Sequence, residues 1–77
     1  MTVAKRSVVV AGHRTSVSLE APFWEVLGEI ARARGLSAQA LIGEIDAARK
    51  GENLSSAIRV FVLGQLRGSR AEGQPPG

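Results

Sequence analysis

The chain has 77 residues, of which 44% are hydrophobic and 22% are charged, so its composition is that of one small globular domain. It contains no cysteine, which excludes disulfides and thiolate metal sites, and its single histidine cannot form a metal or haem site alone. No apolar run approaches the roughly 18 residues that a membrane span needs, and the first apolar stretch is too short for a signal peptide. We therefore expect a cytoplasmic domain with no cofactor and no membrane partner.

The net charge of +3 is concentrated at the start of the chain. Lys5, Arg6 and Arg14 are the only charged residues among the first 19, and the remaining seven basic residues balance all seven acidic ones. Such a basic segment is either a solvated arm or a surface directed at a polyanion such as nucleic acid. Charge alone does not decide between these two interpretations.

Residues 15–19 alternate polar and apolar side chains, which predicts a half-buried strand. Thr15, Val17 and Leu19 would share the face that packs on the protein interior, and the residues at even positions would face solvent. The backbone groups of this strand need hydrogen-bond partners. Two solutions are open: residues 7–10 of the same chain can form a second strand, or the strand can pair with its own copy in a second chain.

Three helices are predicted after this strand. Pro22 suits the start of the first helix, Gly35 suits its end, and Ser37 is a good N-cap for the second. Asn53 or Ser55 can cap the third helix, which is apolar on more than one side and would be covered in part by another subunit. The residues expected in the core or the dimer interface are Val17, Leu19, Trp24, Leu27, Ile30, Leu41, Ile42, Ile45, Ile58 and Phe61.

Three sequence motifs succeed one another with short spacers. They are Arg14-Thr15-Ser16-Val17-Ser18-Leu19-Glu20, then Phe23-Trp24-x-x-Leu27-x-x-Ile30-Ala31, then Gly35-Leu36-Ser37-x-x-x-Leu41-Ile42. Together they resemble a ribbon-helix-helix DNA-binding domain, over roughly residues 5 to 67. A Gly-His-Arg-Thr-Ser lead-in at 12–16 and an Asn-Leu-Ser-Ser-Ala segment at 53–57 are similar to a short bacterial subfamily.

The resemblance implies a mainly α-helical fold with a short strand that pairs across a homodimer, two helices and an extra C-terminal helix. On this interpretation residues 1–6 form a basic N-terminal arm and residues 7–67 form the ribbon-helix-helix domain with its third helix. Residues 68–77 are rich in glycine and proline and hold no large apolar group, which predicts a disordered tail.

The resemblance also implies a homodimeric transcriptional regulator, a repressor, that binds the major groove of double-stranded DNA with a two-stranded ribbon. Assembly beyond the dimer on DNA stays open. The residues expected to contact bases are Arg14, Ser16 and Ser18, and those expected to contact phosphates are Lys5, Arg6, His13, Ser37 and Ala38. For the start of the second helix there is an independent reason, since free amides and a positive dipole end attract anions.

The alternative function is a protein-interaction module, such as an antitoxin-like subunit that masks a partner protein. Its active parts would be the third helix and the tail. An enzyme is not expected, because Ser16 and Ser18 have no general base in view and no G-x-S-x-G turn surrounds them. Glu44 and Asp46 are two residues apart on a helix and face different directions, so they do not form an acid–base pair.

Overall fold

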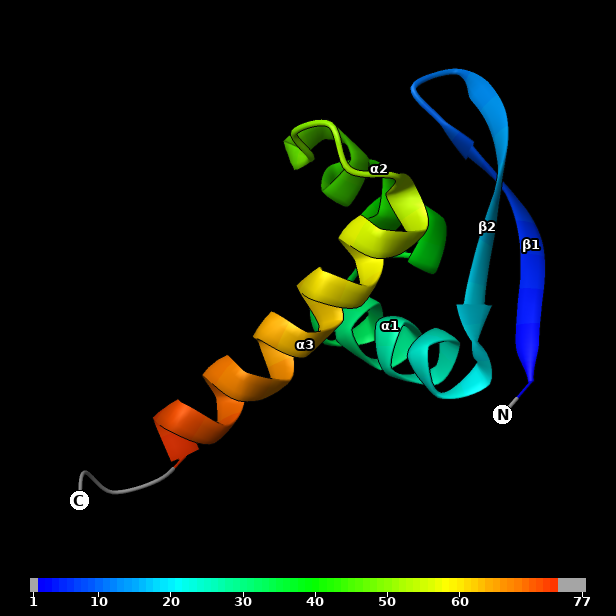
Figure 1. Cartoon of the computed structure of the whole chain (residues 1–77). Coiled ribbons are helices and arrows are strands. Elements are labelled where there is room, and N and C mark those ends of the chain that lie inside the picture. The colour runs from blue at the N-terminus through cyan, green and yellow to red at the C-terminus, as the bar shows by residue number, and fades with distance from the viewer. Residues whose placement is uncertain (1, 74–77) are drawn as a thin grey trace.

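A β-hairpin stands beside three helices in the computed structural model, which describes residues 2–73 (Figure 1). The three helices that the sequence predicts are confirmed. In chain order the elements are β1 (Val3–Val10), β2 (His13–Glu20), α1 (Ala21–Ala33), α2 (Ala38–Ala48) and α3 (Leu54–Gly73).

The two strands are antiparallel and fully paired, with Val3 opposite Glu20 at one end and Val10 opposite His13 at the other. The loop between them is only two residues long. Ala11 and Gly12 have φ angles of 53° and 81°. Positive φ at both loop positions is typical of the type I′ turn, whose twist matches that of the flanking strands. Because so short a loop closes at little entropic cost, pairing within the chain is favoured.

The strand at residues 15–19 pairs within the chain, because β1 occupies one of its two edges. Pairing across a homodimer stays a prediction for the other edge. The second solution, a strand that includes residues 7–10, is the one observed. Residues 3–6, expected in a loose arm, also belong to β1, since they continue the same antiparallel ladder.

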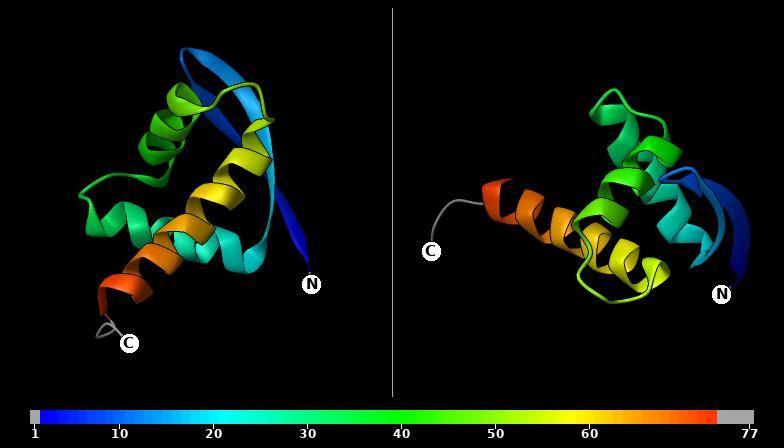
Figure 2. Two further views of the ribbon diagram at one scale, coloured as in Figure 1. Left: turned by 60° about the vertical axis from the view of Figure 1, so that its left-hand side comes forward. Right: turned by 90° about the horizontal axis from the view of Figure 1, so that it is seen from above.

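The third helix is longer than the sequence suggested. It continues to Gly73, so residues 68–73 of the expected disordered tail are helical. Residues 74–77 of that tail lie outside the described residues. Figure 2 shows that the C-terminal part of α3 extends beyond the other two helices.

Side-chain caps fix the start of the last two helices. The Ser37 hydroxyl oxygen accepts a hydrogen bond of 3.0 Å from the Ala40 N–H, which confirms Ser37 as the N-cap of α2. The Asn53 side-chain oxygen accepts one of 2.8 Å from the Ser56 N–H. Of the two residues considered for the cap of α3, Asn53 is therefore the one used, which leaves Ser55 available for another contact.

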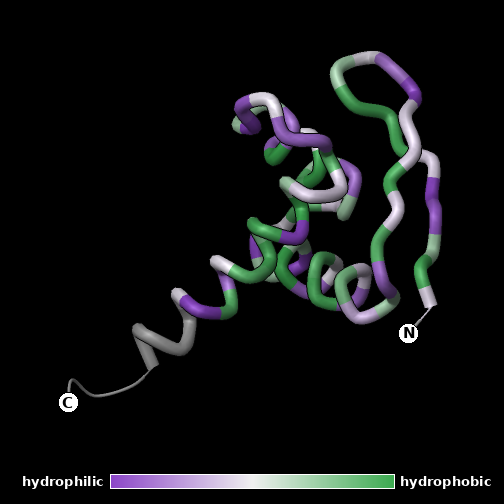
Figure 3. The backbone as a smooth tube through the Cα atoms, in the orientation of Figure 1, coloured by the Kyte–Doolittle hydropathy of each residue, from purple (hydrophilic) through white to green (hydrophobic). Residues whose placement is uncertain are grey.

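The hydrophobic core lies between one face of the hairpin and the three helices. Ile30 and Phe61 are half-buried and pack against it. Hydrophilic stretches of the hairpin lie in the middle of β1 and just after the turn (Figure 3). The buried residues are Val8, Val10, Val17, Leu19, Trp24, Leu27, Ala31, Leu41, Ile42, Ile45, Ala57, Ile58 and Val62.

Candidate nucleic-acid interface

The hairpin presents two different faces, because side chains alternate along each strand and paired residues share a face. The inner face includes Val8, Val17 and Leu19, which are buried against the helices. The opposite surface, called here the outer face, points away from them. The outer face consists of Val3, Lys5, Ser7, Val9, Arg14, Ser16, Ser18 and Glu20.

The outer face carries two basic side chains among neutral ones, and it also exposes Val3 and Val9. Lys5 and Arg14 are exposed on it, and Glu20, at the end next to α1, is its only acidic residue. The Glu20 carboxylate accepts a hydrogen bond of 2.9 Å from the Nε–H of Arg59 in α3. This ion pair offsets the one negative charge, so the exposed charges that remain on the face are cationic.

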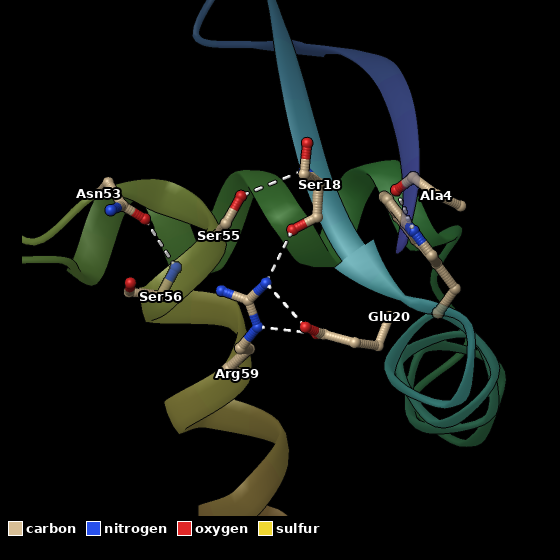
Figure 4. Close-up of polar contacts among 8 residues, drawn as sticks. Ala4, Ser18, Glu20, Asn53, Ser55, Ser56 and Arg59 are labelled. Atoms are coloured by element: carbon tan, nitrogen blue, oxygen red, sulfur yellow. Dashed lines mark hydrogen bonds and ion pairs between the residues drawn. The ribbon is translucent and has the colours of Figure 1, made fainter. Parts of the chain in front are cut away.

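Two residues of α3 also bind the backbone of β2 at Ser18 (Figure 4). The Ser18 N–H donates to the hydroxyl oxygen of Ser55 at 3.2 Å, and Arg59 donates through Nη2 to the Ser18 carbonyl oxygen at 3.2 Å. We call this pair of contacts the α3 clamp. It closes the edge of β2 at Ser18 and leaves that residue half-buried, whereas Ser16 is exposed.

The ion pair with Arg59 makes the stability of the fold depend on pH. The side-chain hydrogen bond from Arg59 lowers the pKa of Glu20 below its ordinary value of 4.5, and a backbone hydrogen bond and the Arg59 charge act in the same direction. A lowered folded-state pKa stabilises the protein above the unfolded-state pKa, and this contribution is lost as the pH falls through the folded-state value.

We therefore expect acid to destabilise the wild type more than the Arg59→Gln variant once the pH falls below about 4.5. Thermal unfolding measured from pH 7 downward checks this. Glu20→Gln serves as the matched control, because it should remove the same pH-dependent contribution from the other side of the pair. Parallel pH profiles for all three proteins would contradict the expected role of the pair.

The remaining edge of β2 is open. The backbone groups of Ser18 point toward α3 and away from β1. Because this direction alternates along an antiparallel strand, those of Arg14 and Ser16 point the same way. Within residues 2–73 no helix or loop hydrogen-bonds to them. An open groove of about 730 Å³ runs along this edge, bordered on its far side by the end of α2 and the start of α3.

On the other side of the hairpin, the start of α2 lies next to β1. The Val9 N–H donates to the side-chain oxygen of Gln39 at 3.1 Å, which holds the first turn of α2 beside the strand. Ala38 borders a second groove, of about 510 Å³, together with Arg6. The same groove is lined by Glu25, Glu29 and Arg32, so its charges balance.

Arg6 is held over the ring of Trp24. Its guanidinium carbon lies 4.7 Å from the ring centroid, within the range of a cation–π interaction. The indole N–H of Trp24 donates to the Ala4 carbonyl oxygen at 2.9 Å, which fixes the ring against β1. Arg6 therefore belongs to the inner side of the hairpin, although it remains exposed.

The structure separates the two basic residues that the sequence analysis grouped together. Lys5 shares the outer face with Arg14 and Ser16, whereas Arg6 lies on the opposite side near Ala38.

Ser7 was missed by the sequence analysis, and the structure places it on the outer face opposite Ser16. The signal that would have found it is the period-two alternation of β1. His13 is exposed directly after the turn, and Ser37 caps α2.

Residues 2–73 offer neither a metal site nor a membrane span. No group of three or more His, Cys, Asp or Glu side chains in this part of the chain is placed to hold a metal ion. No helix within it is long and apolar enough to cross a membrane.

A two-stranded ribbon followed by packed helices defines a known class of domain. The sequence profile of the Ribbon-helix-helix domain matches residues 3–66, and the chain belongs to this family. Its members are typically non-enzymatic modules, either DNA-binding regulators or antitoxin-type proteins, and they usually bind DNA as dimers.

A solved structure has a similar fold. It is that of an uncharacterized protein from Bordetella pertussis Tohama I, which superimposes with a TM-score of 0.76 and is 34% identical in sequence. The match covers 99% of this chain but 64% of the Bordetella protein, so the chain spans slightly less than two thirds of that protein's length. No curated protein matches the chain.

Proposed function

We propose that this chain is a homodimeric DNA-binding transcriptional regulator, a repressor, that inserts the outer face of its ribbon into the major groove. One observation carries the proposal: the outer face exposes Lys5 and Arg14 beside small hydroxyl side chains, and its only carboxylate is neutralised by Arg59. An exposed, cationic, two-stranded ribbon is suited both to the phosphate backbone and to base edges in the groove.

The dimensions of the groove assign different roles to the two strands. The major groove is about 12 Å wide, and neighbouring strands lie about 4.8 Å apart. If two copies join through the open edges of β2, the two β1 strands lie on either side of the central pair of β2 strands. The β1 strands are then separated by about 14 Å, which is too wide for the groove floor. The β2 residues Arg14, Ser16 and Ser18 then contact bases, and Lys5 of β1 contacts phosphates on the groove walls.

The other phosphate contacts belong to two separate places. Ser37 and Ala38 lie at the start of α2, where unpaired amides and the positive end of the helix dipole attract an anion such as a phosphate. Arg6 lies near Ala38 and is oriented by Trp24. His13, directly after the turn and next to Arg14, adds a further phosphate contact.

The test is a salt titration of binding to fragments of genomic DNA. We expect the affinity to fall steeply with salt, because phosphate contacts release counterions. Lys5→Ala should weaken binding to all fragments about equally. It should reduce the log–log salt slope by about 1.8, because each of the two copies in the dimer loses one phosphate contact worth about 0.9. Lys50→Ala, which removes an exposed charge after α2, is the control. Affinity that does not change with salt would refute the proposal.

One observation favours the antitoxin-like alternative. Val60, Leu63 and Leu66 of α3 are 70%, 53% and 47% exposed. With Phe23 they line a shallow apolar pocket of about 250 Å³. For a DNA-binding protein, Leu63→Ser should leave DNA affinity unchanged. Loss of a co-purifying partner on this substitution, together with absence of DNA binding in the wild type, would favour the alternative.

A further inference from the structure

The hairpin is attached to the helices unevenly along its length. In the half next to α1, the Trp24 indole binds the Ala4 carbonyl oxygen and the α3 clamp holds β2 (Figure 4). The other half, residues 7–16, is called here the turn half. In the part of the chain that the structure describes, its one hydrogen bond to a helix runs from the Val9 N–H to the side-chain oxygen of Gln39, at 3.1 Å.

Apolar packing alone does not fix the orientation of the turn half. Val8 and Val10 are buried against the helices. Such contacts are non-directional, and two-stranded ribbons twist more strongly than larger sheets. A hydrogen bond, in contrast, has a preferred distance and angle. Gln39 therefore supplies the directional contact that sets how the turn half lies on the helices.

Val9 is also the cross-strand partner of Arg14. The backbone groups of Ser18 point away from β1, and by alternation so do those of Arg14, so Val9 and Arg14 form a non-hydrogen-bonded pair. Their Cα atoms are about 4.5 Å apart, and the side chains of such a pair lie close together. Fixing the Val9 backbone therefore fixes the ribbon at the point where the Arg14 side chain begins.

We propose that Gln39 is a positioning residue for Arg14, and that the preference of the protein for particular DNA sequences depends on it. This inference rests on the proposed DNA-binding function. Leu41 and Ile42 are fully buried, so the core holds α2, and α2 holds the Val9 backbone through Gln39. Contacts with base edges need exact placement, whereas attraction to phosphates does not depend on sequence. Loss of the contact should therefore affect preferred DNA more than random DNA.

Gln39→Met tests the contact itself in the free protein. Methionine has a similar helix propensity but is only a weak acceptor, and the side chain of Gln39 is exposed, so the fold should be retained. We expect the Val9 amide proton to exchange with solvent at least about twofold faster, the lower limit for one hydrogen bond. The Val8 amide, which pairs with Thr15 inside the ladder, should keep its protection. Hydrogen exchange followed by NMR measures both.

The second measurement is the ratio of affinities for two DNA probes, the genomic fragment that binds most tightly and a random fragment of equal length. Gln39→Met should lower this ratio about 2- to 10-fold for each of the two copies in the dimer, the worth of one hydrogen bond. In the Arg14→Ala background the same substitution should leave the ratio unchanged, because the side chain that Gln39 positions is absent. A merely structural role would change the ratio equally in both backgrounds.

Two matched variants accompany this test. Gln65 also accepts a hydrogen bond through its side-chain oxygen, from Nη2 of Arg34 at 2.9 Å, but it joins α3 to the end of α1. Gln65→Met should therefore keep the wild-type ratio. Gln39→Glu retains an acceptor, so it should restore the protection of Val9 and the preference for the best fragment. Its negative charge should lower the affinity for both DNA probes alike.

The possible outcomes separate this role from the proposed function. An unchanged ratio in Gln39→Met, with faster exchange of Val9, would overturn the positioning role and leave the DNA-binding function intact. So would an equal loss in the Arg14→Ala background, an equal loss in Gln65→Met, or failure of Gln39→Glu to restore the ratio. A wild type without affinity for either DNA probe would overturn the proposed function and the positioning role together.

Discussion

Leu19→Ala is expected to lower the free energy of unfolding by about 2–5 kcal/mol, the cost of removing a buried leucine side chain and leaving a cavity. Leu19 has no exposed surface and joins the inner face of the hairpin to the helices. Small domains have a total stability of only about 5–15 kcal/mol, so a large part of it would be lost. Chemical denaturation measures the change directly, and thermal unfolding should show a midpoint lower by at least about 10 °C.

The control is Leu66→Ala, which makes the same chemical change on α3. Leu66 is 47% exposed, and alanine has a higher helix propensity than leucine, so the expected change is within about 0.5 kcal/mol. Equal losses for the two variants would contradict the expectation. They would show that the exposed side of α3 is covered in solution by another molecule.

Local sequence patterns predicted most of the elements. The alternation around Val17 and Leu19 indicated a strand with one buried face, and both residues are fully buried. Ser37 was predicted as a helix cap because its hydroxyl can satisfy an amide only three residues away. These features depend on neighbours within one or two turns, so they can be derived from the sequence alone.

The hairpin was harder to predict because its turn lacks the usual signal. Two-residue loops with positive φ at both positions favour Asn-Gly or Asp-Gly, whereas this one is Ala11-Gly12. Alanine seldom adopts a φ of 53°. Pairing of β1 with β2 was therefore only one of two solutions, and the resemblance to a one-strand family favoured the other.

The sequence predicted only the part of the candidate site that lies on β2, because the pairing of β1 with β2 was not known. Period-two geometry placed Arg14 and Ser16 away from the helices without any knowledge of β1. The different positions of Lys5 and Arg6 became clear only from the strand register. The α3 clamp joins Ser18 to residues 37 and 41 positions later in the chain, and no local pattern predicts such a contact.

Arg14→Ala is expected to weaken binding to the preferred DNA fragment by about 1–3 kcal/mol, or roughly 5- to 150-fold, for each of the two copies in the dimer, with little effect on stability. Arg14 is exposed on the outer face and has no acidic neighbour opposite it, because its cross-strand partner is Val9. Its guanidinium group is therefore available to a guanine or a phosphate. Binding isotherms at two salt concentrations, with preferred and random DNA, measure the loss of affinity and of discrimination.

Two further variants separate charge from geometry in this result. Arg14→Lys keeps the positive charge but cannot form the planar, bidentate hydrogen bonds of a guanidinium group to guanine. The variant should therefore retain affinity for random DNA and lose its preference for the best fragment. Arg67→Ala removes an equal charge from exposed α3, away from the ribbon, and should bind like the wild type. If Arg14→Ala and Arg67→Ala bind DNA equally well, the ribbon does not contact bases. The function then shifts to protein interaction through α3, whose exposed leucines would be the next residues to substitute.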